Sequence, residues 1–310
     1  DDGFSNKIIW PGAVFTYRGQ ELPVQLLKSQ IGARSESMLN SSIESLEYEI
    51  ANAINNLTIV DVPRIAFIEG HGELSDLETA SLAKSLADLY AVDRISLDQN
   101  LNSLTERYMV DSTQSYKVKV IYDAIIIAKP LKKFSEKDKF IIDQYVMYGG
   151  RIVWLIDPVF ASMDSLKSTE VTMALPIDLN LNDQLFTYGV RVNTNMVQDI
   201  QSAPIPIVTG AVGNQPKTEM FPWFFFPLLT PANNHPIVNN LNALKGEFVS
   251  TIDTIAKKGI KKTPLLKTSQ YSKVSSAPTR ISLEIVRFEP DQTQFNQGRQ
   301  LTAVLLEGQF

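Results

Sequence analysis

Glu69, His71 and Glu73 alternate along the segment Glu69-Gly70-His71-Gly72-Glu73, and these residue types could do chemistry together. In an extended segment residues i, i+2 and i+4 point to one side, and two carboxylates with an imidazole suit a divalent cation. The chain offers no further ligand that the sequence can place, and His235 is its only other histidine. We favour a loop histidine with a structural role, and we predict no bound metal.

The same segment almost matches a dinucleotide-binding fingerprint through Gly70, Gly72 and Ser75. The third glycine is missing, and Glu69, Glu73 and Asp76 would put negative charge where a pyrophosphate docks. The glycines are better explained by a tight turn from a strand into a helix. We therefore predict no nucleotide and no other cofactor.

The sequence contains no recognisable motif for a catalytic nucleophile. There is no cysteine, and no G-x-S-x-G elbow is present to expose a serine. The prediction is that the protein is not an enzyme.

Alternating strand and helix patterns surround these residues. Short apolar runs at residues 64–68, 92–97, 123–128 and 151–156 predict strands. Helices are predicted at 75–90, with the capping box Ser75 and Glu78, and at 135–148, opened by Glu136 and Asp138. Since Ala124–Ala128 is apolar throughout, it is typical of a strand buried on both faces.

The predicted fold class is therefore α/β, a doubly wound, mostly parallel sheet with helices on both faces. In such sheets ligands bind outside the carboxyl ends of strands. That edge would hold Glu69, His71, Glu73 and Asp157, which we take as candidate ligand or partner residues.

Two domains are expected. Residues 1–60 read as extended segments, Lys7–Trp10 and 13–17 around Pro11-Gly12, and then a long amphipathic helix at 36–57; they are expected to be the edge or remnant of a preceding domain. Residues 61–310 would form the α/β domain, loop-rich from about 165. In that half we predict a helix at 182–188 and strands at 205–208, 247–252, 280–286 and 301–306.

An aromatic stretch at residues 221–229 includes Trp223, Phe224 and Phe225. Aromatic clusters fill cores and also mark interfaces. Because the neighbouring prolines restrict it to an edge or irregular strand, some rings could lie near the surface. Core packing and a partner site both remain open.

Charge and hydropathy limit the kinds of partner that the sequence allows. The net charge of −5 argues against nucleic acid, and the basic run 257–262 is short enough to be a solvated turn. No apolar run is long enough to cross a bilayer. Since the sequence starts at Asp1 without a signal peptide, we expect a piece of a longer protein whose membrane anchors lie elsewhere.

The order of these segments resembles the auxiliary components of uncharacterised ABC transport systems, most closely the gliding-motility (GldG-like) members. The carrying segments are residues 64–73, 123–130, 148–158, 188–193, 234–237, 264–269 and 305–308. The resemblance implies an extracytoplasmic (periplasmic) protein beside an ABC permease and ATPase, with an architecture similar to class I glutamine amidotransferases and to a domain of intraflagellar-transport proteins. Without the amidotransferase cysteine, such a fold would serve binding, as in a pseudoenzyme.

Three functions stay open on these grounds. The leading prediction is a non-catalytic binding or scaffold component of the transporter, linked to gliding motility or surface secretion. The alternatives are a hydrolase or metal-dependent enzyme acting on a sugar or peptide, and a purely structural protein of a cell-surface machine.

Overall fold

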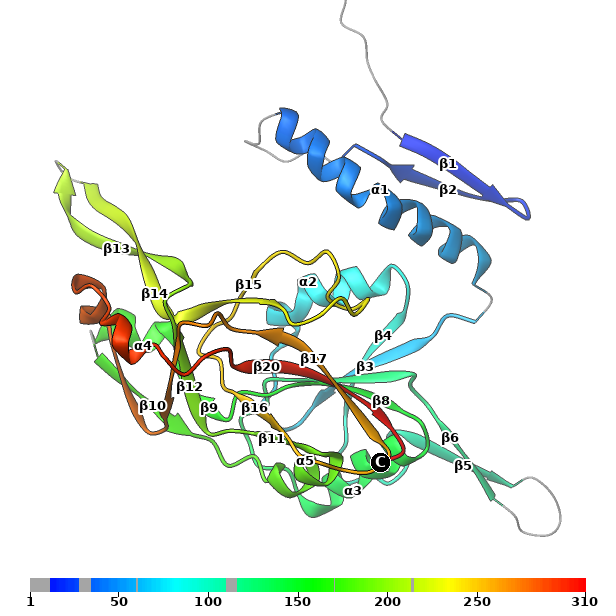
Figure 1. Cartoon of the computed structure of the whole chain (residues 1–310). Helices are drawn as coiled ribbons and strands as arrows, with labels where there is room; N and C mark the ends of the chain where they lie inside the picture. Colours follow the sequence, from blue (N-terminus) through cyan, green and yellow to red (C-terminus); the bar gives the residue numbers. More distant parts are fainter. Residues whose placement is uncertain (1–11, 28–34, 60, 110–115, 170, 213–214) are drawn as a thin grey trace, which may run out of the picture. The chain divides into compact units, whose positions relative to one another are not determined.

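The computed structural model describes residues 12–27, 35–59, 61–109, 116–169, 171–212 and 215–310 (Figure 1). The predicted segment Lys7–Trp10 and Pro11 of the predicted turn lie outside these residues. The chain divides into two compact units, Asp1–Ala66 with Ser75–Asp93, and Phe67–Leu74 with Arg94–Phe310. The predicted domain boundary at residue 60 stays a prediction.

The first unit contains a hairpin and two helices. Strands β1 (Gly12–Tyr17) and β2 (Gln20–Gln25) pair antiparallel and contact α1 (Ser35–Thr58), which matches the helix predicted at 36–57. Helix α2 (Asp76–Ala87) begins at Ser75, whose backbone N–H donates to Glu78 Oε2 at 2.8 Å, as the capping box predicts. Among the described residues, no helix combines the length and apolar character needed to span a membrane.

Two strands continue from the first unit into the second. They are β3 (Arg64–Glu69) and β4 (Ala91–Ser96), and they join β7 (Ala124–Ala128) and β8 (Arg151–Leu155) in a sheet of order β4-β3-β7-β8. Strands β7 and β8 are parallel and are connected through α3 (Glu136–Met147). These strands and α3 agree with the predicted elements.

The predicted fold class is nevertheless wrong, and the amidotransferase-like architecture with it. The structure is mostly β, with twenty strands and five α-helices among the described residues. Outside the four-stranded sheet, the strand pairs are antiparallel. The physical reason is that the apolar runs of residues 64–156 indicate a parallel sheet only for that part of the chain, whereas long-range antiparallel pairing dominates after residue 156.

A five-stranded antiparallel sheet contains the longest strands. They are β13 (Ser202–Val212), β14 (Gln215–Pro231), β17 (Ile260–Lys267) and β20 (Leu301–Gly308), with β15 (Leu244–Lys245) beside β14. Figure 1 shows β13 and β14 as a long hairpin. Prolines are accommodated because β13 is an edge strand and Pro204 lies opposite Pro222, so neither strand needs a donor there.

Short elements complete the second unit. The pairs and triplets are β5 (Thr105–Met109) with β6 (Tyr116–Val120), β9 (Val159–Phe160) with β10 (Val171–Pro176) and β19 (Thr279–Ser282), β11 (Val190–Val192) with β16 (Ile252–Thr254), and β12 (Asn195–Asp199) with β18 (Ser272–Ser276). The remaining helices are α4 (Met163–Ser168), α5 (Asn182–Tyr188) and the 3-10 turns η1 (Leu283–Arg287) and η2 (Gln292–Gln294). Helix α5 is as predicted. The strand predicted at 247–252 is wrong, since β16 begins only at Ile252, and the one at 280–286 ends early in η1.

Candidate functional site

The 69–75 turn leads from β3 to α2, and its two glycines are required by its backbone. Gly70 has φ +115° and Gly72 has φ +75°, which favour glycine. A side chain at Gly70 would also approach Ser96 Oγ to 3.2 Å. The backbone is tied to the segment after β7, because the His71 carbonyl accepts from the N–H groups of Leu131 and Lys132 at 2.9 and 2.7 Å.

His71 lies at the centre of this turn and is only 7% exposed. Its ring stacks on Phe134 with 3.8 Å between the centroids and 10° between the planes. Nδ1 lies 3.2 Å from Glu73 Oε1, and Nε2 lies 3.4 Å from Asp138 Oδ2. Both ring nitrogens can donate to these carboxylates only in the imidazolium form.

The two carboxylates favour that charged form. Burial lowers the pKa of His71, but hydrogen bonds and charge from Glu73 and Asp138 outweigh it, so the pKa is raised above its ordinary value. Glu73 Oε2 also accepts from the His71 backbone N–H at 2.7 Å. Asp138 accepts from the backbone N–H of Gln99 at 3.1 Å and from Ser135 Oγ at 2.7 Å. Each member of this cluster therefore has its partners inside the second unit.

Glu69 and Asp157 belong to other interactions. Glu69 Oε1 accepts from Arg94 Nε at 2.5 Å, and Arg94 also donates to the Leu74 carbonyl at 2.9 Å. Asp157 lies 3.2 Å from Lys129 Nζ; burial raises the pKa of its carboxyl, and the ammonium group only partly offsets this. The structure thus brings His71 and Glu73 together but gives Glu69 and Asp157 separate cationic partners. No metal-binding group of three or more His, Cys, Asp or Glu side chains occurs in the described part of the chain.

The aromatic candidates lie in a core of the second unit. Trp223, Phe224 and Phe225 are 0%, 6% and 2% exposed. Trp223 packs against Phe225 with ring centroids 5.3 Å apart, and Phe224 against Phe295 at 5.6 Å. The geometry supports core packing, the first of the two alternatives that the sequence left open.

Sequence reasoning missed two members of the His71 cluster, Phe134 and Asp138. Asp138 was recognised only as an acidic residue in the first turn of a helix. The available signal was the spacing of Ser135 and Asp138, which are hydrogen-bonded at the start of α3. Nothing local in the sequence indicates that His71, 67 residues earlier, meets that helix start.

Comparison with known proteins adds one strong result. A family model described as "ABC-type uncharacterized transport system" matches residues 62–310. No curated protein gives a match. Among solved structures, one described as "mmIFT52 N-terminal domain" is similar, with a TM-score of 0.43 and 17% identity over 67% of this chain and 74% of that chain.

Proposed function

The chain belongs to the family of ABC-type uncharacterized transport systems, as its sequence predicted, and we propose that it is a non-catalytic binding or scaffold component of such a system. Its proposed partners are the permease and ATPase of the same system. The proposed location is the extracytoplasmic face of the inner membrane, with a role in gliding motility or surface secretion.

The observation that carries the non-catalytic proposal is that the polar side chains of the 69–75 turn already hydrogen-bond within the protein. A general base must reach a substrate proton, and its position must leave a lone pair for that proton. His71 is buried with both nitrogens directed at carboxylates, and Glu73 has a side chain only 2% exposed. These groups are arranged to hold the turn, so the proposal needs no catalytic step.

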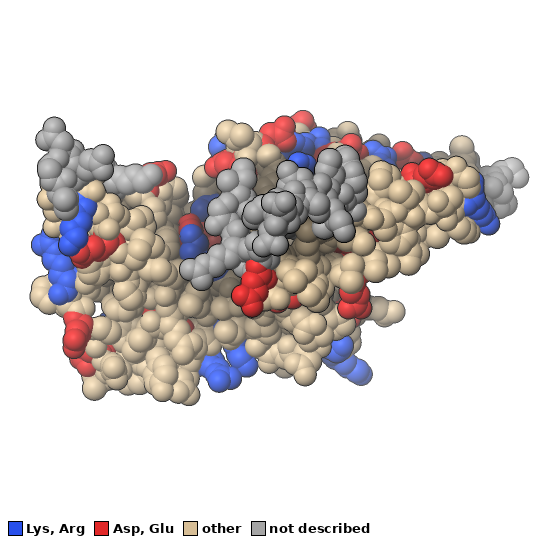
Figure 2. All heavy atoms as spheres, turned by 90° about the horizontal axis from the view of Figure 1, so that it is seen from above, with Lys and Arg blue, Asp and Glu red and all other residues tan. Residues whose placement is uncertain are grey.

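Charge on the surface is consistent with a protein partner. On the face drawn in Figure 2, Lys and Arg are interspersed with Asp and Glu and do not form one basic patch. Phosphate backbones are bound by clustered basic groups, so this face offers no reason to propose a nucleic-acid partner.

A contact surface for the transport partners is proposed on α1. Leu39, Ile43 and Leu46 share one stripe of this helix and are 50%, 61% and 38% exposed. Further along the same stripe Ala53 is buried. Exposed apolar side chains in a row are typical of interfaces. The aromatic stretch is left out of this proposal because the rings of Trp223, Phe224 and Phe225 are buried.

The test is affinity capture of the full-length protein from membranes in mild detergent. We expect the permease and ATPase to be recovered with the unmodified protein. Ile43→Asp should reduce recovery about tenfold, since a buried unpaired charge at an interface costs well over 1.4 kcal/mol. Ser41→Asp, which adds the same charge at an exposed polar position of α1, is the matched control.

Three outcomes would contradict parts of the proposal. If folded Ile43→Asp recovers the permease as well as Ser41→Asp does, the α1 surface is wrong. If the unmodified protein brings down no permease, the transport role is wrong. Sustained turnover of glutamine or p-nitrophenyl esters through repurification would instead overturn the non-catalytic assignment.

A further inference from the structure

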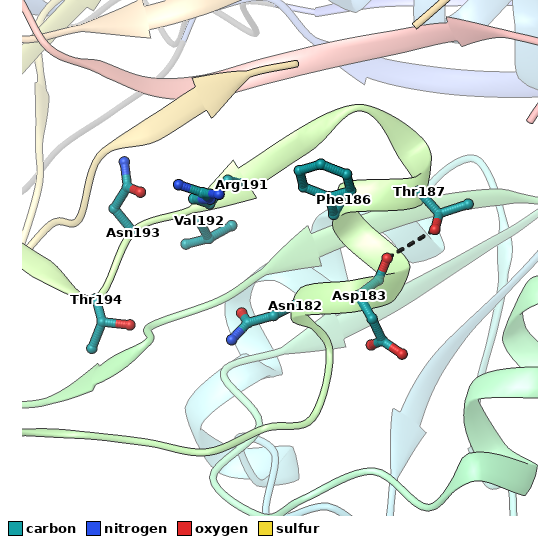
Figure 3. Close-up of a pocket in the computed structure, with 8 residues that line it drawn as sticks. All are labelled: Asn182, Asp183, Phe186, Thr187, Arg191, Val192, Asn193 and Thr194. Atoms are coloured by element: carbon teal, nitrogen blue, oxygen red, sulfur yellow. Dashed lines mark hydrogen bonds between the residues drawn. The ribbon is translucent and has the colours of Figure 1, made fainter. Parts of the chain in front are cut away.

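A corner between α5 and β11 in the second unit forms an open pocket of about 570 Å³. This volume lies within the range of small-molecule sites. Figure 3 shows its lining, which comes from the helix, the strand and the two residues after it: Asn182, Asp183, Phe186, Thr187, Arg191, Val192, Asn193 and Thr194.

Local sequence explains the shape of the corner. Asn182, Asp183, Phe186 and Thr187 share one face of α5 because residues four apart lie one above the other. Gln184, Leu185 and Tyr188 are buried on its other side. Gly189 ends the helix with φ +95°, and a side chain there would meet Lys262 Cε at 2.8 Å. The chain can therefore reverse directly into β11.

The charges lining the corner are unequal. Both Asp183 carboxylate oxygens accept from Lys139 Nζ, at 2.8 and 2.7 Å, and this hydrogen bonding holds the pKa of Asp183 below its ordinary value. Arg191, in contrast, is exposed and has no ion-pair or hydrogen-bond partner within the described residues. Arg191 is the one cation among the lining residues, and Asp253 lies opposite it in the β11–β16 pair without forming an ion pair with it. Its guanidinium geometry suits a carboxylate.

An exposed aromatic ring and polar side chains that make no hydrogen bond within the described residues lie around Arg191. Phe186 is 50% exposed, and Figure 3 shows its ring on the same side of the corner as Arg191. The side chains of Asn182 and Thr194 make no hydrogen bond in the part of the chain that the structure describes. The Asn193 side chain is already hydrogen-bonded within the protein, because its Nδ2 donates to Thr251 Oγ1 and Asp253 Oδ2, both at 2.9 Å.

We propose that this corner binds an acidic saccharide, a sugar ring that carries a carboxylate. The apolar C–H face of the ring would stack on Phe186, as apolar faces do on exposed aromatic rings. The carboxylate would pair with Arg191, and ring hydroxyls would bind Asn182 and Thr194. A phosphate-rich ligand fits less well because Arg191 is the only cation among the lining residues.

The proposal is tested by titrating the isolated chain with trigalacturonate. With one ring of about a dozen atoms engaged, the expected Kd is on the order of 1 mM. Arg191→Gln should weaken binding about tenfold or more, and Phe186→Ala about two- to tenfold. The controls Arg299→Gln and Phe288→Ala change exposed residues that do not line the corner, and should leave Kd unchanged.

Each other result would overturn the assignment. Equal binding of neutral maltotriose would show that the carboxylate is not recognised. Equal binding of an acetylated triaspartate peptide would show that the corner takes acidic peptides, and no binding up to about 20 mM would exclude a usable site. Since no permease is present, the result is independent of the proposed transport role.

Discussion

The 69–75 turn and the α5–β11 corner differ in how well a sequence motif indicates free binding groups. The turn carries the most distinctive motif of the chain, yet His71, Glu73 and Asp138 satisfy one another inside the protein. The corner has no recognisable motif, yet it presents a half-exposed Phe186 and an unpaired Arg191. A cluster of reactive residue types is therefore evidence for a site only when some of its hydrogen-bonding or charged groups have no partner within the protein.

The largest expected effect is on the turn. His71→Ala removes the ring stacked on Phe134 and leaves two buried carboxylates without their cation, so we expect a loss of about 3 kcal/mol in the free energy of unfolding. Urea denaturation measures it. His235→Ala, in an only partly buried position, should cost within about 1 kcal/mol. Equal effects of the two variants would contradict the structural role of His71.

A pH series sharpens this prediction. The pKa of His71 is raised in the native state, so its charged interaction stabilises fully below the unfolded-state pKa of about 6.5 and is lost as pH rises through the native pKa. The stability gap between the unmodified protein and His71→Gln should therefore be widest in mild acid and narrow toward alkaline pH. A gap that widens as pH rises would mean that His71 is neutral in the fold.

Glu69 should contribute less than His71. Its side chain is 46% exposed in the ion pair with Arg94, and such pairs stabilise by about 1 kcal/mol or less. Glu69→Gln is expected to lower the free energy of unfolding by no more than that amount in urea. A loss as large as that of His71→Ala would place Glu69 inside the cluster, against the geometry.

The smallest expected effect is that of divalent cations. Selective binding to the native state would raise the melting temperature, and we expect His71→Ala to leave any such ion effect unchanged. Calorimetric scans with and without Mg²⁺, Mn²⁺ or Zn²⁺ provide the measurement. An ion-dependent stabilisation that disappears in His71→Ala would restore the metal-ligand interpretation.

Local features of the fold could be predicted from the sequence. The apolar runs at β3, β7 and β8 and the capping residues Ser75 and Ser135 specify their elements through neighbouring residues alone. Pairing across long separations could not be predicted, as when Asp199 in β12 meets Ser272 in β18. Periodicity records which face is buried, not which strand is the partner, and the fold class failed for that reason.

The candidate site also has features that local sequence predicts and features that depend on long-range contacts. The glycines of the 69–75 turn were interpretable because positive φ is a local property. The partners of His71 and the pocket beside Arg191 both depend on segments brought together by folding. Trp223, Phe224 and Phe225 were ambiguous because core and interface draw on the same residue types.

One measurement tests the contrast between turn and corner directly, the melting temperature of His71→Gln and Arg191→Gln with and without about 10 mM trigalacturonate. For the unmodified protein we expect the ligand to raise the melting temperature by about 2–3 °C. His71→Gln should melt lower but keep this increment, whereas Arg191→Gln should melt as the unmodified protein does and lose it. A folded His71→Gln that loses the ligand increment while Arg191→Gln retains it would contradict the account.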